Sequence, residues 1–478
     1  MPPNHLLRLT ALRRLNSTSL RLSQRSYATT PFPEQDIYDV VIVGGGPAGL
    51  SLASALRSSS VTNKLKVALI EGQDLGPQKP YKPKPGTFSN RVSSLTPGSV
   101  RFLENIGAWK HIQEERVQDY HGMKVWDGVS NAKIIFSSDL LPTAPTIAYM
   151  CENLNLVSSL LSRLDELGST EILDKARVEG IEYGQDDGEL DLTSWPVVTV
   201  SSGRKLAARL LVGADGANSP VRTFAGIETR GWDYGRHGVV ATLRIEDVEQ
   251  RKQAYQRFLP TGPVALLPLP GDFATMVWST TPQYAAKLKS LSPTDFAAMA
   301  NAAFRLSHVD LKYILENMTS GLAEEVSWRE SATPRDPALT PTHIVDVQAG
   351  SVASFPLKMR HADSYISERI ALIGDAAHSV HPLAGQGLNQ GIGDVQSLVR
   401  TLEHAVQHGQ DVGSLLSLEP YYSEQYLKNH MLMGVVDKLH MLYGTTSPPV
   451  VAVRSLGLSA VNALDGLKSF IMGRAAGR

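Results

Sequence analysis

One glycine-rich segment constrains the fold of this 478-residue chain more than any other feature. An apolar, β-branched run at 39–43 predicts a buried strand. The segment 44–49, Gly-Gly-Gly-Pro-Ala-Gly, follows at once and opens a helix that we expect to end near Ser58. A second apolar strand, predicted over 66–70, leads into Glu71. This order of strand, glycine turn, helix and strand predicts the βαβ unit of a Rossmann-like domain.

Each part of the glycine segment has a physical role in binding a dinucleotide. Gly44 allows the tight turn, Gly46 lets the backbone approach a pyrophosphate, and Gly49 allows the helix to pack closely on the strand. The free N–H groups at the start of the helix stabilise the anion. Glu71 can accept hydrogen bonds from ribose hydroxyls, and an acid here disfavours a ribose phosphate. The alternative is a glycine turn that binds no ligand.

Two further loops follow predicted strands. The segment 213–222, Gly-Ala-Asp-Gly-Ala-Asn-Ser-Pro-Val-Arg, comes after an apolar strand at 206–212. Gly-Asp-Ala-Ala-His at 374–378 comes after another strand, at 369–373, and leads through His381 to a long helix that we expect from about 387 to 408. The chain shows no second Gly-x-Gly-x-x-Gly, so it encodes no separate pyridine-nucleotide domain.

The three motifs, in this order, resemble the FAD-dependent aromatic hydroxylases typified by para-hydroxybenzoate hydroxylase. The resemblance spans residues 44 to 389. It implies that Asp375 binds the ribityl hydroxyls of FAD and that backbone N–H groups near Gly385 and Gly387 face the pyrimidine end of the flavin. Asp215 is either a cofactor-linked residue or a cap of the turn after its strand. The implied cofactor-binding residues are Gly44, Gly46, Gly49, Glu71, Arg91, Asn153, Asp215, Gly374, Asp375, Pro382, Gly385, Gly387, Leu388 and Asn389.

No residue is predicted as a catalytic base and no metal site is expected. We expect His378 and His381 to make local hydrogen bonds and not to bind a metal. The single cysteine, Cys151, excludes disulfides within the chain and is expected to behave as a small buried apolar residue. Charges nearly cancel, with 46 Lys+Arg against 47 Asp+Glu, which argues against a nucleic-acid-binding protein.

The predicted fold is α/β, with a Rossmann-like FAD-binding domain, an inserted sheet-based substrate domain and a C-terminal helical region. Residues 1–33 hold no acid and many Arg and Ser residues, which is typical of a mitochondrial transit peptide, with a disordered basic tail as the alternative. The expected divisions are 1–33 transit peptide, 34–230 first part of the FAD-binding domain with strand-rich segments contributing to the second domain, 231–360 β-sheet substrate domain, 361–410 second part of the FAD-binding domain, and 411–478 C-terminal helices.

The string from Gly374 to Gly391, with Phe355-Pro356-Leu357 upstream, resembles the mitochondrial ubiquinone-biosynthesis monooxygenases that hydroxylate ring position 5. This resemblance implies that a flavin hydroperoxide, formed with O2, hydroxylates the phenolic ring of a polyprenylated precursor. It also implies ferredoxin and its reductase as electron donor, and a complex with other ubiquinone-biosynthesis proteins on the matrix side of the inner membrane. The alternatives are a flavin reductase of the geranylgeranyl-reductase type and a non-catalytic prenyl-binding protein on the same fold.

Two surfaces follow from a long apolar substrate. We expect residues 264–269 and 273–278 to line a substrate tunnel, unless their alternation simply marks core. We also expect one C-terminal helix, with apolar residues from Leu456 to Ile471, to lie on the membrane or dock on the protein's own core. In the membrane-bound case Arg454, Lys468 and Arg474 would contact lipid headgroups. The Pro- and Lys-rich segment 76–90 is predicted to be a loop, as a neutral insertion or a partner contact.

Overall fold

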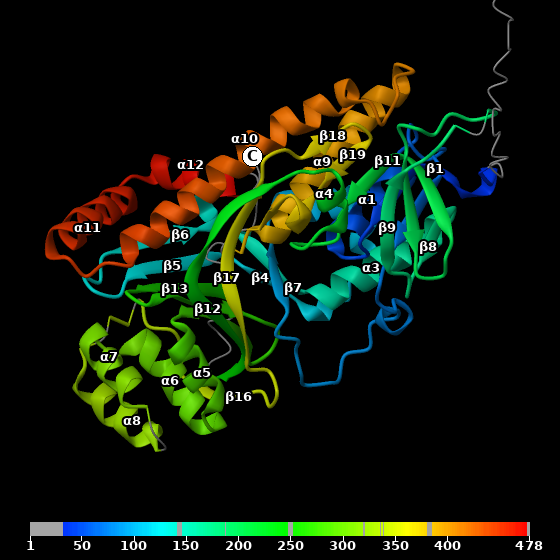
Figure 1. Ribbon diagram of the computed structural model, residues 1–478. Helices are drawn as coiled ribbons and strands as arrows, with labels where there is room; N and C mark the ends of the chain where they lie inside the picture. The colour runs from blue at the N-terminus through cyan, green and yellow to red at the C-terminus, as the bar shows by residue number, and fades with distance from the viewer. Residues whose placement is uncertain are drawn as a thin grey trace, which may run out of the picture.

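The computed structural model describes residues 32–140, 146–186, 188–246, 252–318, 321–334, 336–337, 339–379 and 385–475. These residues form two large sheets, a small three-stranded sheet and the helices that cover them (Figure 1). The predicted transit peptide, apart from its last two residues, lies outside the described residues.

The first sheet, which we call sheet 1, contains the predicted βαβ unit. Parallel pairing joins β1 (Ile37–Val43) to β2 (Val67–Ile70) on one side and to β11 (Lys205–Gly213) on the other. The sheet runs in the order β18 (Ile366–Ser367), β19 (Ile370–Leu372), β11 (Lys205–Gly213), β1 (Ile37–Val43), β2 (Val67–Ile70), β8 (Thr170–Leu173), with β10 (Pro196–Val200) and β9 (Val178–Tyr183) branching from β11. Helix α1 (Pro47–Ser58) packs against α3 (Asn153–Leu167) and α9 (Gly387–Gln407). The Rossmann-like prediction is confirmed.

The second large sheet, sheet 2, lies beside sheet 1 (Figure 1). Its order is β20 (His378–Ser379), β17 (Ala353–Ala362), β12 (Thr229–Ile245), β15 (Phe273–Thr280), β14 (Gly262–Pro268), β13 (Gln253–Leu259), β5 (Gly122–Asp127), β6 (Lys133–Ser137), and β16 (Ile344–Val347) pairs with β12. The sheet therefore takes strands from well outside 231–360. The small sheet joins β3 (Val92–Leu95), β7 (Ala148–Glu152) and β4 (Val117–Tyr120).

Four helices cover one face of sheet 2, and the interpretation of the middle region as strand-rich did not predict them (Figure 1). They are α5 (Pro282–Ser290), α6 (Pro293–Arg305), α7 (His308–Glu316) and α8 (Leu322–Ala332). Leu266 and Trp278, with their neighbours on the same face, are buried against these helices. Half of the predicted tunnel lining is therefore core, because alternate residues of a strand point to opposite faces.

The other face of sheet 2 carries small side chains that the protein only half covers. Strand register places Val240 opposite Val277, and Val277 opposite Ala265, so these three side chains form one row. All three are half-buried, as is Leu267 in the next row along β14. We call Val240, Ala265, Leu267 and Val277 the open face of sheet 2.

Two helices complete the part of the chain before the C-terminal region. Helix α2 (Pro97–Asn105) follows β3 and is capped by Thr96, whose side chain accepts a hydrogen bond from the Ser99 N–H. Helix α4 (Pro220–Phe224) follows β11 and is capped by Ser219.

The C-terminal helices differ from the prediction. Helix α10 spans Leu415–Tyr443, and it is followed by α11 (Pro448–Ala463) and α12 (Asp465–Ala475). The single helix expected near 450–471 is two helices, bent by 92° at a short break. Among the described residues no single helix is long and apolar enough to cross a membrane, although this bent pair passes the same test of length and composition as a unit.

For Arg454 the structure supports the alternative of docking on the protein and not the lipid contact of the membrane-bound case. Its guanidinium is fully buried and forms a two-pronged ion pair with Asp127 of β5, with N–O distances of 2.8 and 2.9 Å. The same group donates to the carbonyls of Leu442 and Thr445. The ammonium of Lys468 is also mostly buried and pairs with Asp465 at 2.9 Å. Arg454 therefore joins α11 to β5, and Lys468 forms an ion pair within α12.

Candidate active site

The three glycines of the first motif are needed for different structural reasons. A methyl group on Gly44, whose φ is +114°, would lie 2.3 Å from the Ala214 carbonyl oxygen, and one on Gly49 would lie 2.0 Å from the Gly44 carbonyl oxygen. Both glycines are therefore required by packing within the protein. A methyl group on Gly46 would meet no protein atom within 4 Å. The space over Gly46, at the start of α1, is open to a ligand.

Glu71 lies at the end of β2 against this glycine turn. One carboxylate oxygen accepts a hydrogen bond from the Gly45 N–H at 2.6 Å, and the other accepts from the Gln73 N–H at 2.7 Å. The carboxylate is therefore fixed in orientation while remaining half-exposed. In this place it can accept hydrogen bonds from the hydroxyls of a ribose.

The Gly374 loop and the start of α9 meet the start of α1. A methyl group on Gly374 would lie 3.4 Å from Cβ of Ala48, and one on Gly391 would lie 3.4 Å from Cα of Gly374. Neither α1 nor α9 has a side-chain hydrogen bond at its N-cap. Two helix N-termini with free N–H groups thus converge on one region, as an anionic cofactor requires.

Two carboxylates border this region. Asp375 is exposed and makes no hydrogen bond or ion pair with any described residue, while the surrounding protein desolvates it enough to raise its pKa. Asp215 is more deeply placed, and burial raises its pKa against opposing hydrogen bonds from Ser219 and from backbone N–H groups. One oxygen accepts from the Val221 N–H at 3.4 Å, and its other oxygen, Oδ1, is buried without a partner among the described residues.

Arg222 connects these two loops, and the sequence analysis assigned it no role. Its guanidinium donates to the Ala376 carbonyl at 2.8 Å and to the Ala217 carbonyl at 2.7 Å. The loop after β11 and the loop after β19 are therefore fixed to each other. The only sequence signal for this role is the arginine at the end of the segment 213–222. Its partner, the Ala376 carbonyl, lies 154 residues farther along the chain.

Arg91 and Asn153 come from a second border of the region. The Asn153 N–H donates to the Arg91 carbonyl at 3.0 Å, and Asn153 Oδ1 accepts from the Ser93 hydroxyl at 2.7 Å. The fully buried Glu152, paired with Arg116 at 2.7 Å, accepts from the Ser89 N–H. These contacts hold residues 88–93, which we call the Arg91 segment, in place. The Arg91 side chain itself is exposed and makes no hydrogen bond or ion pair with a described residue.

The Arg91 segment also joins the two sheets. Gln348, which follows β16 of sheet 2, accepts a hydrogen bond from the Phe88 N–H and donates to the Phe88 carbonyl, both at 2.8 Å. Asn90 donates to the Ser351 carbonyl at 2.5 Å. The segment that carries Arg91 therefore lies at the boundary with sheet 2.

The predicted residues after 384 are brought to the same place. The Asn389 side chain accepts from the Thr96 N–H at 3.0 Å and from the Ser99 hydroxyl at 2.8 Å, and donates to the Ser94 carbonyl at 2.8 Å. Its amide is committed to the protein, so a cofactor contact here must use backbone N–H groups. Gly385 is exposed, and Gly387 and Leu388 open α9. Pro382 and His381 lie outside the described residues.

His378 and Cys151 take the roles expected of them. His378 is buried and hydrogen-bonded to Asp394 at 2.6 Å. Burial, followed by the charge of Glu152, raises the pKa of the Cys151 thiol to about 12, so this cysteine stays protonated at physiological pH.

The donor set fits FAD. An open space over Gly46 suits a pyrophosphate, Glu71 suits a ribose, and the exposed carboxylate of Asp375, which has no partner in the described part of the chain, suits a polyol. The unpartnered Oδ1 of Asp215 adds an acceptor to the same region.

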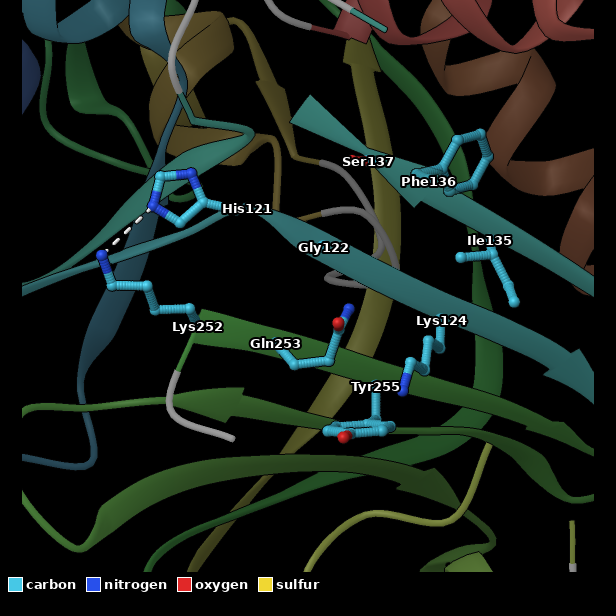
Figure 2. Close-up of a pocket in the computed structure, with 9 residues that line it drawn as sticks. All are labelled: His121, Gly122, Lys124, Ile135, Phe136, Ser137, Lys252, Gln253 and Tyr255. Atoms are coloured by element: carbon cyan, nitrogen blue, oxygen red, sulfur yellow. Dashed lines mark hydrogen bonds between the residues drawn. The ribbon is translucent and has the colours of Figure 1, made fainter. Parts of the chain in front are cut away.

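A surface cavity of about 480 Å³ lies elsewhere (Figure 2). Lys124, Tyr255 and Lys252 are among its lining residues, and the side chains of Lys124 and Tyr255 point into it. Strand register places Lys124 beside Tyr255 and Tyr255 beside Leu266, which is on the face of sheet 2 that packs against α5–α8. The cavity is therefore on the opposite face from the open face, and none of the predicted cofactor residues lines it.

Comparisons with known proteins agree with this geometry. The family model described as "FAD binding domain" matches residues 37–425. The mitochondrial ubiquinone biosynthesis monooxygenase COQ6 of Schizosaccharomyces pombe is 42% identical over 96% of both chains. The COQ6 protein of Saccharomyces cerevisiae is 41% identical over 95% of this chain and 96% of its own, and that of Homo sapiens is 38% identical over 91% and 92%.

Solved structures share the fold at lower identity. The p-nitrophenol 4-monooxygenase PnpA of Pseudomonas putida has a TM-score of 0.64 and 19% identity, over 92% of this chain and 99% of its own. PqsL of Pseudomonas aeruginosa has a TM-score of 0.63 and 20% identity, over 90% and 100%. The curated relatives named above are monooxygenases, which favours the hydroxylase over a reductase or a binding protein. This chain belongs to the COQ6 family of mitochondrial ubiquinone biosynthesis monooxygenases, and it is an FAD-dependent aromatic monooxygenase.

Proposed function

We propose that this enzyme hydroxylates ring position 5 of a polyprenylated phenol during ubiquinone biosynthesis. The observation that carries the proposal is the match to the yeast COQ6 proteins, which covers nearly the whole of each chain. A second support is the open face of sheet 2, an apolar surface at the boundary with the cofactor region.

The following residues are proposed to hold FAD. The pyrophosphate lies over Gly46 at the start of α1, and Glu71 accepts from the adenosine ribose. Asp375 accepts from the ribityl hydroxyls. Backbone N–H groups from Gly385 to Asn389 face the pyrimidine end of the ring, where the positive end of the α9 dipole favours negative charge. Bound FAD supplies the chemistry that activates O2, so that one oxygen atom enters the ring and the other leaves as water.

The open face of sheet 2 is proposed to contact the substrate ring. Val240, Ala265 and Val277 form a row of small apolar side chains, and such a surface accepts an aromatic ring and excludes water from the reacting atoms. Thr242, in the next row, lies within 3.4 Å of the Phe88 carbonyl through its hydroxyl. The Arg91 segment therefore borders this face directly. In this arrangement the segments 34–230 and 361–410 bind FAD, and 231–360 supplies most of the substrate surface.

The C-terminal helices are proposed to place the enzyme on the matrix side of the inner membrane. Val453 and Leu456 on α11 and Phe470 on α12 are 61–72% exposed, and Leu464 and Leu467 add to this apolar surface. Exposed apolar surface of this extent marks a protein or membrane contact. We propose a peripheral membrane contact because a polyprenyl substrate resides in the bilayer.

The electron donor and the partners are also part of the proposal. We propose that ferredoxin and its reductase reduce the flavin and that the enzyme works in a complex with other ubiquinone-biosynthesis proteins. The absence of a second Gly-x-Gly-x-x-Gly in the sequence supports a separate donor.

The experiment that tests the reaction uses purified, FAD-loaded enzyme, ¹⁸O2 and a short-chain polyprenylated phenol. We expect one ¹⁸O atom in the product, located at ring position 5 by NMR, with reduced ferredoxin as electron source. Hydroxylation at another position would contradict the proposed regiochemistry. Faster turnover with NADPH alone than with ferredoxin would contradict the proposed donor.

The membrane contact has its own test. We expect the double variant Leu456→Ser and Phe470→Ser to lose most binding to cardiolipin-containing vesicles while keeping its bound FAD. The matched control is Trp328→Ser, which removes an equally exposed apolar side chain from α8. Equal vesicle binding by the double variant and the unmodified enzyme would refute the proposed membrane surface.

A further inference from the structure

The loop that carries Asp375 is held from behind by one buried carboxylate. Asp394, on α9, is fully buried, and its Oδ2 accepts hydrogen bonds from the Gly374 N–H at 3.0 Å and from His378 Nε2 at 2.6 Å. Gly374 and His378 flank Asp375 at the two ends of a single turn. We infer that Asp394 and His378 form a latch that sets the conformation in which Asp375 binds FAD, with both acting as positioning residues.

The second oxygen of Asp394 connects the latch to α10. Oδ1 accepts a hydrogen bond from Asn429 Nδ2 at 2.9 Å. Three donors, two from the loop at 374–378 and one from α10, therefore satisfy this carboxylate. A buried carboxylate is tolerated only when it is paired in this way. The loop cannot move away from the cofactor region without leaving the Asp394 charge unsatisfied.

The turn itself leaves Asp375 free to bind. Gly374 has φ of +60°, in the left-handed region, and the Ala377 N–H donates to the Gly374 carbonyl at 2.9 Å. Arg222 fixes the outer side of the turn through the Ala376 carbonyl. Among the described residues, the hydrogen bonds that hold the turn use its backbone or His378, and none uses the Asp375 carboxylate.

The protonation of His378 strengthens the latch. Burial lowers the pKa of this imidazole, but the charge and hydrogen bond of Asp394 outweigh that effect and raise it overall. An imidazolium gives Asp394 a full ionic partner. As pH rises through the His378 pKa the proton is lost, the ion pair becomes a neutral hydrogen bond, and the hold on the loop weakens.

Two of the titratable groups around His378, His361 and Tyr365, do not change charge between pH 6 and 9. His361, on the neighbouring strand β17, has its pKa lowered to about 4 by burial and by the charges of His378 and His430. Burial raises the pKa of Tyr365, whose ring centroid is 5.7 Å from that of His378. Asp375, in the turn itself, has its pKa raised by burial, against the opposing charge of His378.

The test measures FAD affinity of the full-length protein after removal and re-addition of FAD. For Asp394→Asn and for His378→Leu we expect the Kd for FAD to rise at least tenfold. His378→Gln keeps an N–H near the position of Nε2, so we expect it to restore most of the affinity. We also expect affinity of the unmodified protein to fall as pH rises through the His378 pKa, which lies above the ordinary range of histidine, and affinity of His378→Gln to stay level.

The control and the contrary results are as follows. His430→Gln changes an exposed histidine that makes no contact with Asp394, and it is expected to leave the Kd unchanged. An unchanged Kd in a folded Asp394→Asn protein would overturn the latch and leave a purely structural ion pair. If Asp394→Asn does not fold, the two His378 variants decide. Equal Kd values for His378→Leu and His378→Gln would also overturn the proposed latch.

Discussion

The two glycines at either side of α1's first turn give the sharpest test of how this site works. A methyl group at Gly46 meets no protein atom within 4 Å, whereas one at Gly49 would lie 2.0 Å from the Gly44 carbonyl oxygen. The two substitutions Gly46→Ala and Gly49→Ala add the same group three residues apart. We expect the first to damage cofactor binding and the second to damage folding.

The magnitudes follow from these distances. Gly46 has φ of −74°, which alanine adopts freely, so the unfolding free energy of the cofactor-free protein should change by less than about 1 kcal/mol. The added methyl occupies space that a pyrophosphate needs, and the loss of one charge-assisted hydrogen bond costs about 1.5–3 kcal/mol. The Kd for FAD should therefore rise roughly 10- to 150-fold. Gly49→Ala should cost about 3 kcal/mol or more, at the upper end of overpacking.

The assay pairs urea unfolding of the cofactor-free proteins with titration of FAD by flavin fluorescence. The expected pattern is a stable Gly46→Ala protein that binds FAD weakly and a Gly49→Ala protein that unfolds at lower urea. A Gly46→Ala protein with unchanged FAD affinity would refute the placement of the pyrophosphate over that residue. A Gly49→Ala protein as stable as the unmodified one would refute the close approach on which the packing argument depends.

Three other predictions concern separate parts of the molecule. Arg454→Leu leaves the Asp127 charge buried and should cost about 3–5 kcal/mol of stability. Arg400→Ala breaks an exposed ion pair with Glu424 and should cost less than about 1 kcal/mol. Similar losses of stability for the two variants in chemical denaturation would contradict the burial argument. Affinity for FAD should fall on acidification, because the raised pKa of Asp375 lets its carboxylate protonate and become a weaker acceptor. Asp375→Asn should bind FAD weakly and should not show this further loss in acid; a titration of FAD between pH 4 and 7 checks both. Val277→Trp should fill the open face of sheet 2, raising KM for the phenol at least tenfold with FAD affinity unchanged; an unchanged KM would place the substrate elsewhere.

Local sequence was sufficient for the first motif because its chemistry is local. The turn after β1, the start of α1 and the carboxylate at the end of β2 come from one stretch of about 30 residues, and its order of residue types has few other uses. The structure confirms the βαβ unit and places Glu71 against the turn. The roles of all the predicted residues in binding FAD, Glu71 included, are still predictions, although the structure brings the described ones to one region.

Sequence patterns failed where a residue's partner decides its role. Arg454 and Lys468 have the composition of a lipid-binding helix, but their environment is set by Asp127, 327 residues from Arg454, and by the break before Asp465. Alternation in β14 and β15 predicted apolar faces correctly. It did not show which face α5–α8 would cover, since that depends on packing between separate segments.

The sequence alone determined the Rossmann-like, dinucleotide-binding unit, because backbone geometry at glycine and the charge of Glu71 are properties of residues close in the chain. The order of the three motifs between residues 44 and 389 indicated FAD. Only the tertiary structure decided how the three motifs are held together. Arg222 reaches the Ala376 carbonyl, Asp394 holds both ends of the Asp375 turn, and Glu152 fixes the Arg91 segment. These contacts join residues from distant parts of the chain, and their energies depend on burial that no local pattern records.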